Sequence, residues 1–237
     1  MRWHALLVVL GFLGTFLLDG ARTQTHQFSI AVKGSLTTGS QIFLNPNSPD
    51  EIKRAQFSSV KDIFGVGIEI RYRFPETDLA IALSTDYLRG TESSSERVSG
   101  SSIQIPIEDG YRVIPVELTG YFLIPISGEQ LGVYMGGGAG AYFGRRVYSK
   151  ARLEAPTIDA GHGYGIHVLS GISYRFSNRF SLLAEMKFRD LQFDSVNQFP
   201  LAQTIYGPLL VTLPTQPFPS RVHTDGMIFQ LSAAFDL

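Results

Sequence analysis

The chain has 237 residues, a formal net charge of −1 and no cysteine. Its length suits one domain, its near-zero charge gives no reason to expect nucleic-acid binding, and the lack of cysteine excludes disulfides, thiolate metal sites and a lipidated-cysteine anchor. With 24 glycines and 12% aromatic residues, the composition favours many short strands and turns.

The first predicted element is a secretory signal peptide over residues 1–23. Arg2 precedes an apolar run from Ala5 to Leu18, and small and polar residues follow it. This run is shorter than the about 20 apolar residues that a membrane-spanning helix needs; the alternatives are a core helix or an anchor. We expect cleavage between residues 20 and 25, which leaves residues 24–237 as one exported domain.

Apolar and polar residues then alternate along the chain in eight stretches. We place these predicted strands at about 28–36, 63–74, 79–88, 112–124, 131–144, 163–176, 180–189 and 226–237. A period of two is typical of a strand whose faces meet different surroundings, and one face of each stretch carries no Asp, Glu, Lys or Arg. No later segment has 18 consecutive apolar residues, so a mature chain that spans a membrane must do so with strands.

The connections between these strands fall into two classes. Three short ones cover 75–78, 125–130 and 177–179, and four long ones cover 37–60, 89–111, 145–162 and 190–224. Short turns at one rim and long loops at the other are typical of outer-membrane barrels, with the long loops outside the cell. Aromatic residues gather at both ends of the apolar faces, such as Phe74 at one rim and Phe143 at the other, as membrane interfaces favour.

Two long loops are candidates for contact with partners. The loop 89–111 is rich in serine, and we expect it to be mobile. The loop 190–224 has five prolines and an apolar stretch from Ile205 to Val211, which suggests a partner surface, a plug over the mouth or a further hairpin. A further hairpin would make ten strands instead of eight.

The polar faces of the predicted strands carry eleven charged residues. These are Lys33, Glu69, Arg71, Arg73, Asp86, Glu117, Arg175, Glu185, Lys187, Arg189 and Asp236. The interior of an eight-stranded barrel is just wide enough for side chains to fill it, and buried charges must be paired. Six basic and five acidic residues therefore predict a packed lumen charge network, with a gated or narrow ion path as the alternative.

The last strand carries Gly226, Phe229, Leu231, Phe235 and Leu237, with its larger residues on one face. Together with the signal peptide, the eight amphipathic strands and the Gly/Tyr-rich run 132–144, it makes the whole mature chain resemble the small outer-membrane β-barrels of the OmpA, OmpX and OmpW type. In that family the last strand is the insertion signal for the barrel-assembly machinery and commonly ends in Phe. Here Leu237 is the last residue, and Phe235 lies two residues before it.

Catalytic and metal-binding patterns are sparse. His167 and Ser170 are three residues apart in a strand, so they face opposite sides and cannot form a nucleophile pair. His162 and His223 are rim candidates for a metal, with Asp159 and Asp225 near them in sequence; they more often just face water. Glycine-rich runs lie in strands without a following helix or lysine, so a phosphate-binding loop is excluded. We expect no catalytic residues, no metal and no cofactor.

Together these patterns predict an all-β, closed, antiparallel up-and-down barrel in the outer membrane of a Gram-negative-type bacterium. We expect a monomer with a structural or surface-interaction role through loops 89–111 and 190–224. Its expected partners are outer-membrane lipid and lipopolysaccharide, the barrel-assembly machinery and an extracellular partner. The alternatives are a narrow pore or carrier for small or apolar solutes, a lipid-modifying enzyme or protease, and a soluble lipocalin-like binder whose apolar face points inward.

Overall fold

The computed structural model describes residues 27–97, 103–125, 130–224 and 226–237. The signal peptide predicted over 1–23 and its cleavage site lie outside these residues. In the described part of the chain, no helix is long and apolar enough to cross a membrane.

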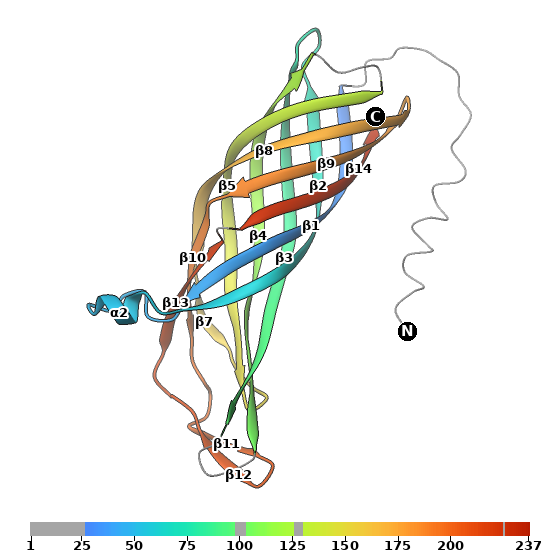
Figure 1. Ribbon diagram of the computed structural model, residues 1–237. Coiled ribbons are helices and arrows are strands. Elements are labelled where there is room, and N and C mark those ends of the chain that lie inside the picture. Colours follow the sequence, from blue (N-terminus) through green and yellow to red (C-terminus); the bar gives the residue numbers. More distant parts are fainter. Residues whose placement is uncertain (1–26, 98–102, 126–129, 225) are drawn as a thin grey trace.

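Eight long strands form one closed antiparallel ring (Figure 1). In ring order they are β1 (Phe28–Phe43), β2 (Phe57–Arg73), β3 (Leu79–Arg97), β4 (Gln104–Ile124), β5 (Leu131–Lys150), β8 (His162–Ser177), β9 (Phe180–Arg189) and β14 (Met227–Asp236). The last strand returns to the first, from the pair Ser29–Asp236 to the pair Thr37–Ile228, so neither strand keeps a free edge over this span. The prediction of a closed eight-stranded barrel is confirmed.

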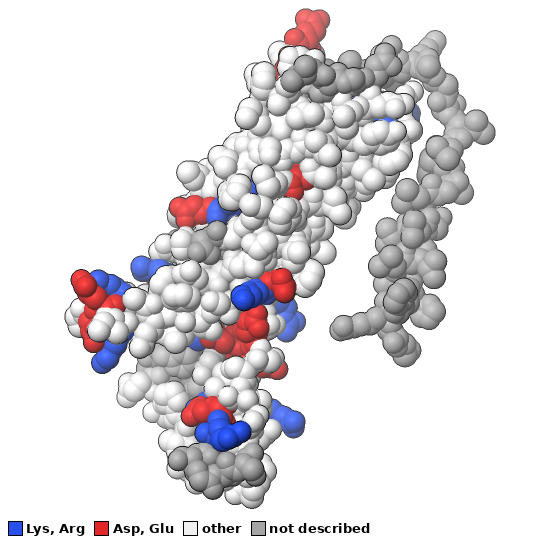
Figure 2. Space-filling view, in the orientation of Figure 1, with Lys and Arg blue, Asp and Glu red and all other residues white. Residues whose placement is uncertain are grey.

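The apolar faces of these strands point outward, as the alternation predicts. Val66 and Leu231 are 66% and 70% exposed, whereas Glu117 on the opposite face is fully buried. Charged side chains on the face in Figure 2 gather mainly toward the β11–β12 end of the molecule, and the surface over the strands beyond them is largely uncharged. An apolar exterior around a charged interior is the arrangement of a barrel in hydrocarbon, and it excludes the lipocalin-like alternative.

The strands are longer than the alternation predicts. β3 and β4 stay paired as far as Arg97 and Gln104, so most of the segment predicted as a mobile loop over 89–111 is a two-stranded ribbon. β1 and β2 likewise stay paired as far as Phe43 and Phe57. Beyond β5, two short strands complete this part of the wall: β6 (Leu153–Ala155) and β7 (Thr157–Ala160). Most of the predicted loops 89–111 and 145–162 and the two ends of 37–60 are therefore wall, and the barrel extends past its apolar belt.

The segment 190–224 also continues the wall. β10 (Leu191–Asn197) follows β9, β13 (Phe218–Thr224) precedes β14, and the two pair along their whole length. Between them, β11 (Gln203–Tyr206) and β12 (Leu209–Thr212) form a separate hairpin at the end of the molecule opposite the C-terminus (Figure 1). The predicted extra hairpin exists as β11–β12, but it forms a separate two-stranded sheet. β10 and β13 continue two strands of the ring and add none to it, so the ten-stranded alternative is wrong.

The short helix α2 (Glu51–Arg54) lies at the tip of the β1–β2 connection (Figure 1). Asp50 caps it, since the backbone N–H of Ile52 donates to Asp50 Oδ1 at 3.0 Å. None of the residues of this helix is buried, so it lies on the surface at the rim and contributes nothing to the core.

One stretch of the wall departs from regular pairing. β8 pairs with β9 from His167 and Arg189 toward the short turns, but residues 162–166 pair in a ladder only with β5 among the described strands. A Cβ on Gly163 would overlap the carbonyl oxygen of Gln192 in β10, and one on Gly165 would overlap that of Asp190 just before β10. The start of β10 therefore passes close to the inner face of β8, which only glycine permits.

Candidate functional site

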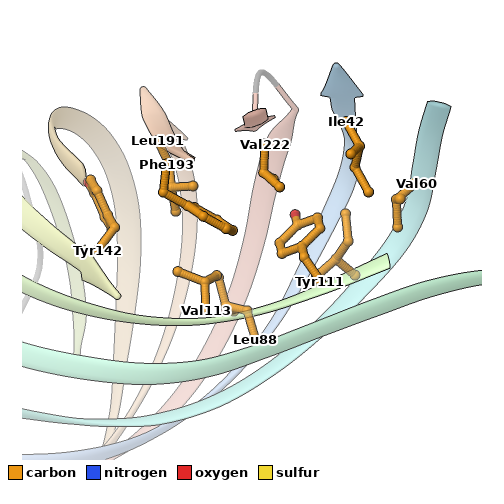
Figure 3. Packing of buried hydrophobic residues seen from close by; sticks show 10 residues of the cluster. Ile42, Val60, Leu88, Tyr111, Val113, Tyr142, Leu191, Phe193 and Val222 are labelled. Carbon is orange, nitrogen blue, oxygen red and sulfur yellow. The ribbon is translucent and has the colours of Figure 1, made fainter. Parts of the chain in front are cut away.

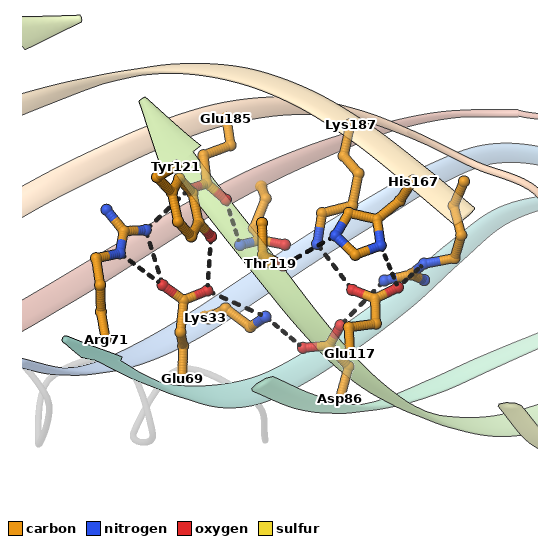
Figure 4. Close-up of polar contacts among 12 residues, drawn as sticks. Lys33, Glu69, Arg71, Asp86, Glu117, Thr119, Tyr121, His167, Glu185 and Lys187 are labelled. Atoms are coloured by element: carbon orange, nitrogen blue, oxygen red, sulfur yellow. Dashed lines mark hydrogen bonds and ion pairs between the residues drawn. The ribbon is translucent and has the colours of Figure 1, made fainter. Parts of the chain in front are cut away.

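The interior at the level of the apolar belt is filled by paired charges, in two linked groups. In the first, the Arg71 guanidinium donates to Glu69 Oε1 at 3.0 and 2.7 Å and to Glu185 Oε1 at 3.4 Å (Figure 4). It lies over the ring of Tyr121 at 3.9 Å, and the hydroxyl of Tyr121 donates to Glu69 Oε2 at 3.1 Å. Tyr134 donates to Glu185 at 2.8 Å. Both carboxylates thus have a cation and a phenol as partners.

The second group is built around Glu117. Its two oxygens accept from Arg189 Nε at 2.6 Å and from Lys187 Nζ at 3.0 Å. Arg189 also pairs with Asp86 at 3.3 Å, and Asp86 pairs with Lys33 at 3.1 Å. Lys33 lies 3.9 Å from Glu69, so it joins the second group to the first (Figure 4).

The structure brings together eight of the eleven charged residues predicted to face the lumen. Four are basic (Lys33, Arg71, Lys187 and Arg189) and four are acidic (Glu69, Asp86, Glu117 and Glu185). With equal numbers of each sign, the network leaves no net charge inside the wall, as low-dielectric surroundings require. The other three, Arg73, Arg175 and Asp236, lie at the short-turn rim, where Arg73 and Arg175 are exposed.

His167 belongs to this network, and sequence reasoning did not include it. Its Nε2 lies 2.9 Å from Thr119 Oγ1 and its Nδ1 lies 3.8 Å from Glu117. Ser170 is exposed on the outer face of the same strand, so the two residues are separated by the wall as expected. The signal that could have placed it inside is the alternation of its strand: Ile166 and Val168 on either side of it face outward, so His167 faces inward.

A second interior region, which we call the lumen cluster, lies on the long-loop side of the network and is apolar. It contains Ile42, Val60, Ile63, Leu88, Tyr111, Val113, Tyr142, Leu191, Phe193 and Val222. These side chains point toward one another from several strands (Figure 3), and the rings of Tyr111 and Phe193 meet edge to face at 6.0 Å. The hydroxyl of Tyr111 lies 3.2 Å from Thr224 Oγ1. Six of these ten residues lie in segments predicted as loops, so the alternation along the strands did not reveal the cluster.

Farther from the membrane, a polar layer and an apolar cap close the barrel. Arg146 donates to both oxygens of Asp109 at 2.8 and 2.7 Å, and Asn197 donates to the carbonyl oxygen of Ala155 at 2.8 Å. Burial raises the pKa of the nearby Tyr148 above its usual range. The cap cluster contains Ile105, Ala151, Ala155, Phe199, Val211 and Leu213. We call the part of the barrel beyond its apolar belt the extension; it comprises the long-loop ends of β1–β5 together with β6, β7 and β10–β13. The extension therefore has an apolar core of its own, like that of a soluble protein.

The predicted insertion strand lies at the closure of the ring. Phe229, Leu231 and Phe235 point outward from β14 and are 48%, 70% and 44% exposed. Leu237 is also exposed, and its N–H donates to the carbonyl oxygen of Phe28 at 2.9 Å. Gly226 lies close to the backbone of Gly39, where the chain passes from β13 to β14. The strand thus presents a row of apolar side chains to lipid, and its role as an insertion signal stays a prediction.

The two rim histidines contact different partners, and Asp225 lies outside the described residues. His223 Nε2 lies 3.4 Å from Asp190, and the exposed His162 contacts the ring of Tyr164. Within residues 27–97, 103–125, 130–224 and 226–237, no three His, Asp or Glu residues are grouped so that they could hold a metal ion. On the outer surface nearby, Asp194 accepts two hydrogen bonds from Arg221 at 2.7 and 3.1 Å, and these bonds raise the pKa of Arg221.

No protein-family model matches this chain, and no curated protein matches it in sequence. In structure it is similar to the outer membrane protein OprG from Pseudomonas aeruginosa, with 12% identity, a TM-score of 0.59, and coverage of 89% of this chain and 95% of that chain. Neisserial surface protein A also matches, with 12% identity, a TM-score of 0.46, and coverage of 89% and 97%. The similarity to OprG and the closed ring of eight strands show that the chain has the fold of the small outer-membrane β-barrels. That fold and the apolar exterior place it in the outer membrane.

Proposed function

We propose that this protein is a monomeric, non-conducting and non-enzymatic barrel that presents a folded β-structure for contact at the cell surface. The observation that supports the proposal most strongly is the filled lumen. Eight charges are paired at the level of the membrane, and the lumen cluster packs directly beyond them. The barrel acts as a rigid base, and recognition takes place at its outer end.

The paired charges oppose conduction for a physical reason. Glu117 is completely buried and holds both Lys187 and Arg189. An ion that crossed the barrel would have to separate such pairs, and each separated charge would then lie in a low-dielectric interior without a partner. A second barrier follows at the lumen cluster, whose side chains are apolar except for the hydroxyls of Tyr111 and Tyr142, so an ion would be poorly solvated there.

The extension supports the surface role. Its strands continue the barrel wall, and the cap cluster gives its tip a core of its own. At that tip, Leu201, Ile205 and Leu210 are 54%, 76% and 63% exposed. Apolar side chains exposed together on a well-supported tip favour contact with a protein partner.

Planar-bilayer recording tests the closed lumen. The purified, folded protein is expected to give a silent membrane, and the variant Glu117→Ala, which removes the shared carboxylate, is expected to give at least brief openings. Discrete, sustained conductance steps from the wild-type protein would contradict the proposal and favour the narrow-pore alternative.

The surface role is tested on the β11–β12 hairpin. We expect Ile205→Asp to reduce adhesion or autoaggregation of cells that display the protein, because a charge on the exposed apolar face opposes its burial against a partner. Gln203→Asp is the matched control, since Gln203 is an exposed polar residue on the same strand. Equal adhesion of the two variants and the wild type would remove this hairpin as the contact surface.

A carrier for apolar solutes is the second candidate. The lumen cluster supports it, since it offers an apolar lining beside residues 162–165 of β8, which within the described ranges form a ladder with β5 alone. Uptake of a labelled long-chain hydrocarbon by cells would favour this role if the variant Phe193→Asp abolished it. Uptake that is unchanged by loss of the protein would exclude it.

A further inference from the structure

Three arginines form a single row across the outer wall. Arg89 of β3 pairs with Arg112 of β4, and Arg112 pairs with Arg145 of β5. Directly opposite residues on one face have Cβ atoms about 4.5–5.5 Å apart, and like charges in such pairs destabilise a sheet. The row therefore carries a cost that a bound anion would remove.

No acidic side chain among the described residues neutralises this row. Arg71, Arg146, Arg189 and Arg221 each form an ion pair with Asp or Glu. None is formed by Arg89, Arg112 or Arg145 within the described ranges. Arg112 is half-buried, and its Nε atom is buried without a hydrogen-bond partner in the described part of the chain. A buried guanidinium N–H needs an acceptor, and phosphate oxygens match guanidinium geometry well.

The row lies at the level of lipid head groups. One step toward the membrane on the same strands are Tyr87, Ile114 and Phe143, which are outward-facing residues of the apolar belt. Aromatic residues at the end of such a belt mark the membrane–water interface. Because the row is on the long-loop side, this interface belongs to the outer leaflet.

Shallow apolar hollows lie beneath the arginines on the same wall. One, of about 580 Å³, is lined by side chains that include Leu118, Ala139, Ala141 and Ile166. A second, of about 790 Å³, lies farther down the same strands and borders Gly120. A Cβ on Gly120 would meet only one atom within 4 Å, at 3.8 Å, so the wall is recessed there. The hollows have the apolar surface that an acyl chain fits.

We propose that this wall binds a phosphorylated, acylated glycolipid of the outer leaflet, the class to which lipopolysaccharide belongs. Arg89, Arg112 and Arg145 hold its phosphate, and the hollows along β4 and β5 receive its acyl chains. The site lies on the outside of the barrel, so it is independent of whether the lumen conducts and of what the tip contacts.

Native mass spectrometry of the full-length protein, released from detergent micelles, tests the site with bis-phosphorylated lipid A as the probe. Replacing the three arginines by glutamine in R89Q/R112Q/R145Q is expected to lower the affinity at least about tenfold, since charge-assisted contacts to phosphate are lost. The control R73Q/R175Q/R179Q removes the same charge from exposed arginines at the short-turn rim, and we expect it to bind like the wild type. The different gel mobility of folded and heated samples checks that each variant is folded.

Two further arms separate the phosphate from the chains. Dephosphorylated lipid A is expected to bind at least about tenfold more weakly than the phosphorylated form, and Ala141→Phe, which fills the upper hollow, is expected to weaken binding of the phosphorylated form. Inorganic phosphate at the same concentration is expected not to displace the lipid. Wild-type affinity in R89Q/R112Q/R145Q, equal binding of dephosphorylated lipid A, or displacement by inorganic phosphate would each overturn the proposal.

Discussion

The membrane-spanning part of this barrel and its extension are built from the same sheet, but the apolar side chains lie on the outer face in the first and on the inner face in the second. In the spanning part, apolar residues such as Leu118 face outward and charges such as Glu117 face inward. In the extension the arrangement is reversed: Gln192 and Asp194 face outward, and Leu191 and Phe193 are buried inside. The two parts therefore match two solvents, hydrocarbon and water, with one continuous wall.

The reversal takes place within a few residues. Phe188 is 46% exposed at the end of β9, Arg189 is buried in the charge network, and Leu191 is buried in the lumen cluster at the start of β10. The side chains keep alternating through this point, but the apolar residues move from the outer face to the inner one. What changes along the strand is the solvent outside it and not its secondary structure.

The largest expected effect comes from breaking the charge network. Glu117→Ala leaves Lys187 and Arg189 buried without their shared carboxylate, and we expect it to lower the free energy of unfolding by about 3–5 kcal/mol. Denaturant unfolding of the reconstituted barrel, followed by the far-UV circular dichroism of its β-structure, measures the loss.

The control for that variant is Glu154→Gln, which removes an exposed carboxylate of the extension. We expect a change within about 0.5 kcal/mol there. If the two variants were equally stable, the charges of the lumen would be hydrated and the interior of the spanning part would not be dry.

The next effect tests the extension. Phe193→Ala removes a ring from the lumen cluster, where its neighbours include Tyr111, and a buried Phe-to-Ala change costs about 3 kcal/mol or more. Because the spanning part has its own interior, we expect the loss to appear first as faster proteolysis of β10–β13, while the β-content of the barrel is retained. A protease-resistant β10–β13 hairpin in this variant would show that the lumen cluster does not hold the extension together.

The reversal of polarity also explains how far the sequence determined the fold in advance. The eight strands, their outward faces and their closure followed from alternation, since the belt near Val66 and Leu231 is uniformly apolar on one side. The strand ends did not follow from alternation. The strands were predicted where one face stays apolar, and that face becomes polar at Arg89, although the strand continues. The residues beyond it were then assigned to loops.

The site shows the same division. The alternation of side chains along each strand identified eight inward charges. It cannot show which of them form pairs, because pairing depends on the register between strands across the ring. The pair Asp109–Arg146 was missed altogether, since both residues lie beyond the predicted strand ends. The row of three arginines also required the register of β3, β4 and β5 before its members could be recognised as neighbours.

A smaller effect is expected from placing one charge on the outer face of each part. Leu118→Arg puts a cation in the apolar belt, which costs about 2–3 kcal/mol on the lipid face of a barrel. Gln192→Arg makes an equivalent change on the outer face of the extension, where we expect almost no cost because water solvates the new charge. Unfolding titrations in vesicles of both variants measure the difference. Equal costs would mean that the membrane boundary does not lie at the reversal.

The smallest effect concerns two carboxylate–guanidinium pairs within the extension. Asp194 and Arg221 form a bidentate pair on the outer surface, with side chains 58% and 35% exposed. Water and salt screen such a pair, so Asp194→Asn should cost only about 0.2–1 kcal/mol. Asp109 and Arg146 have the same geometry inside the wall, at 11% and 4% exposure, and Asp109→Asn should cost more because Arg146 then lacks its counter-charge. Raising the ionic strength should reduce the effect of Asp194→Asn and leave that of Asp109→Asn nearly unchanged. Comparable losses at both positions would mean that water enters the extension, and its interior would then resemble its surface.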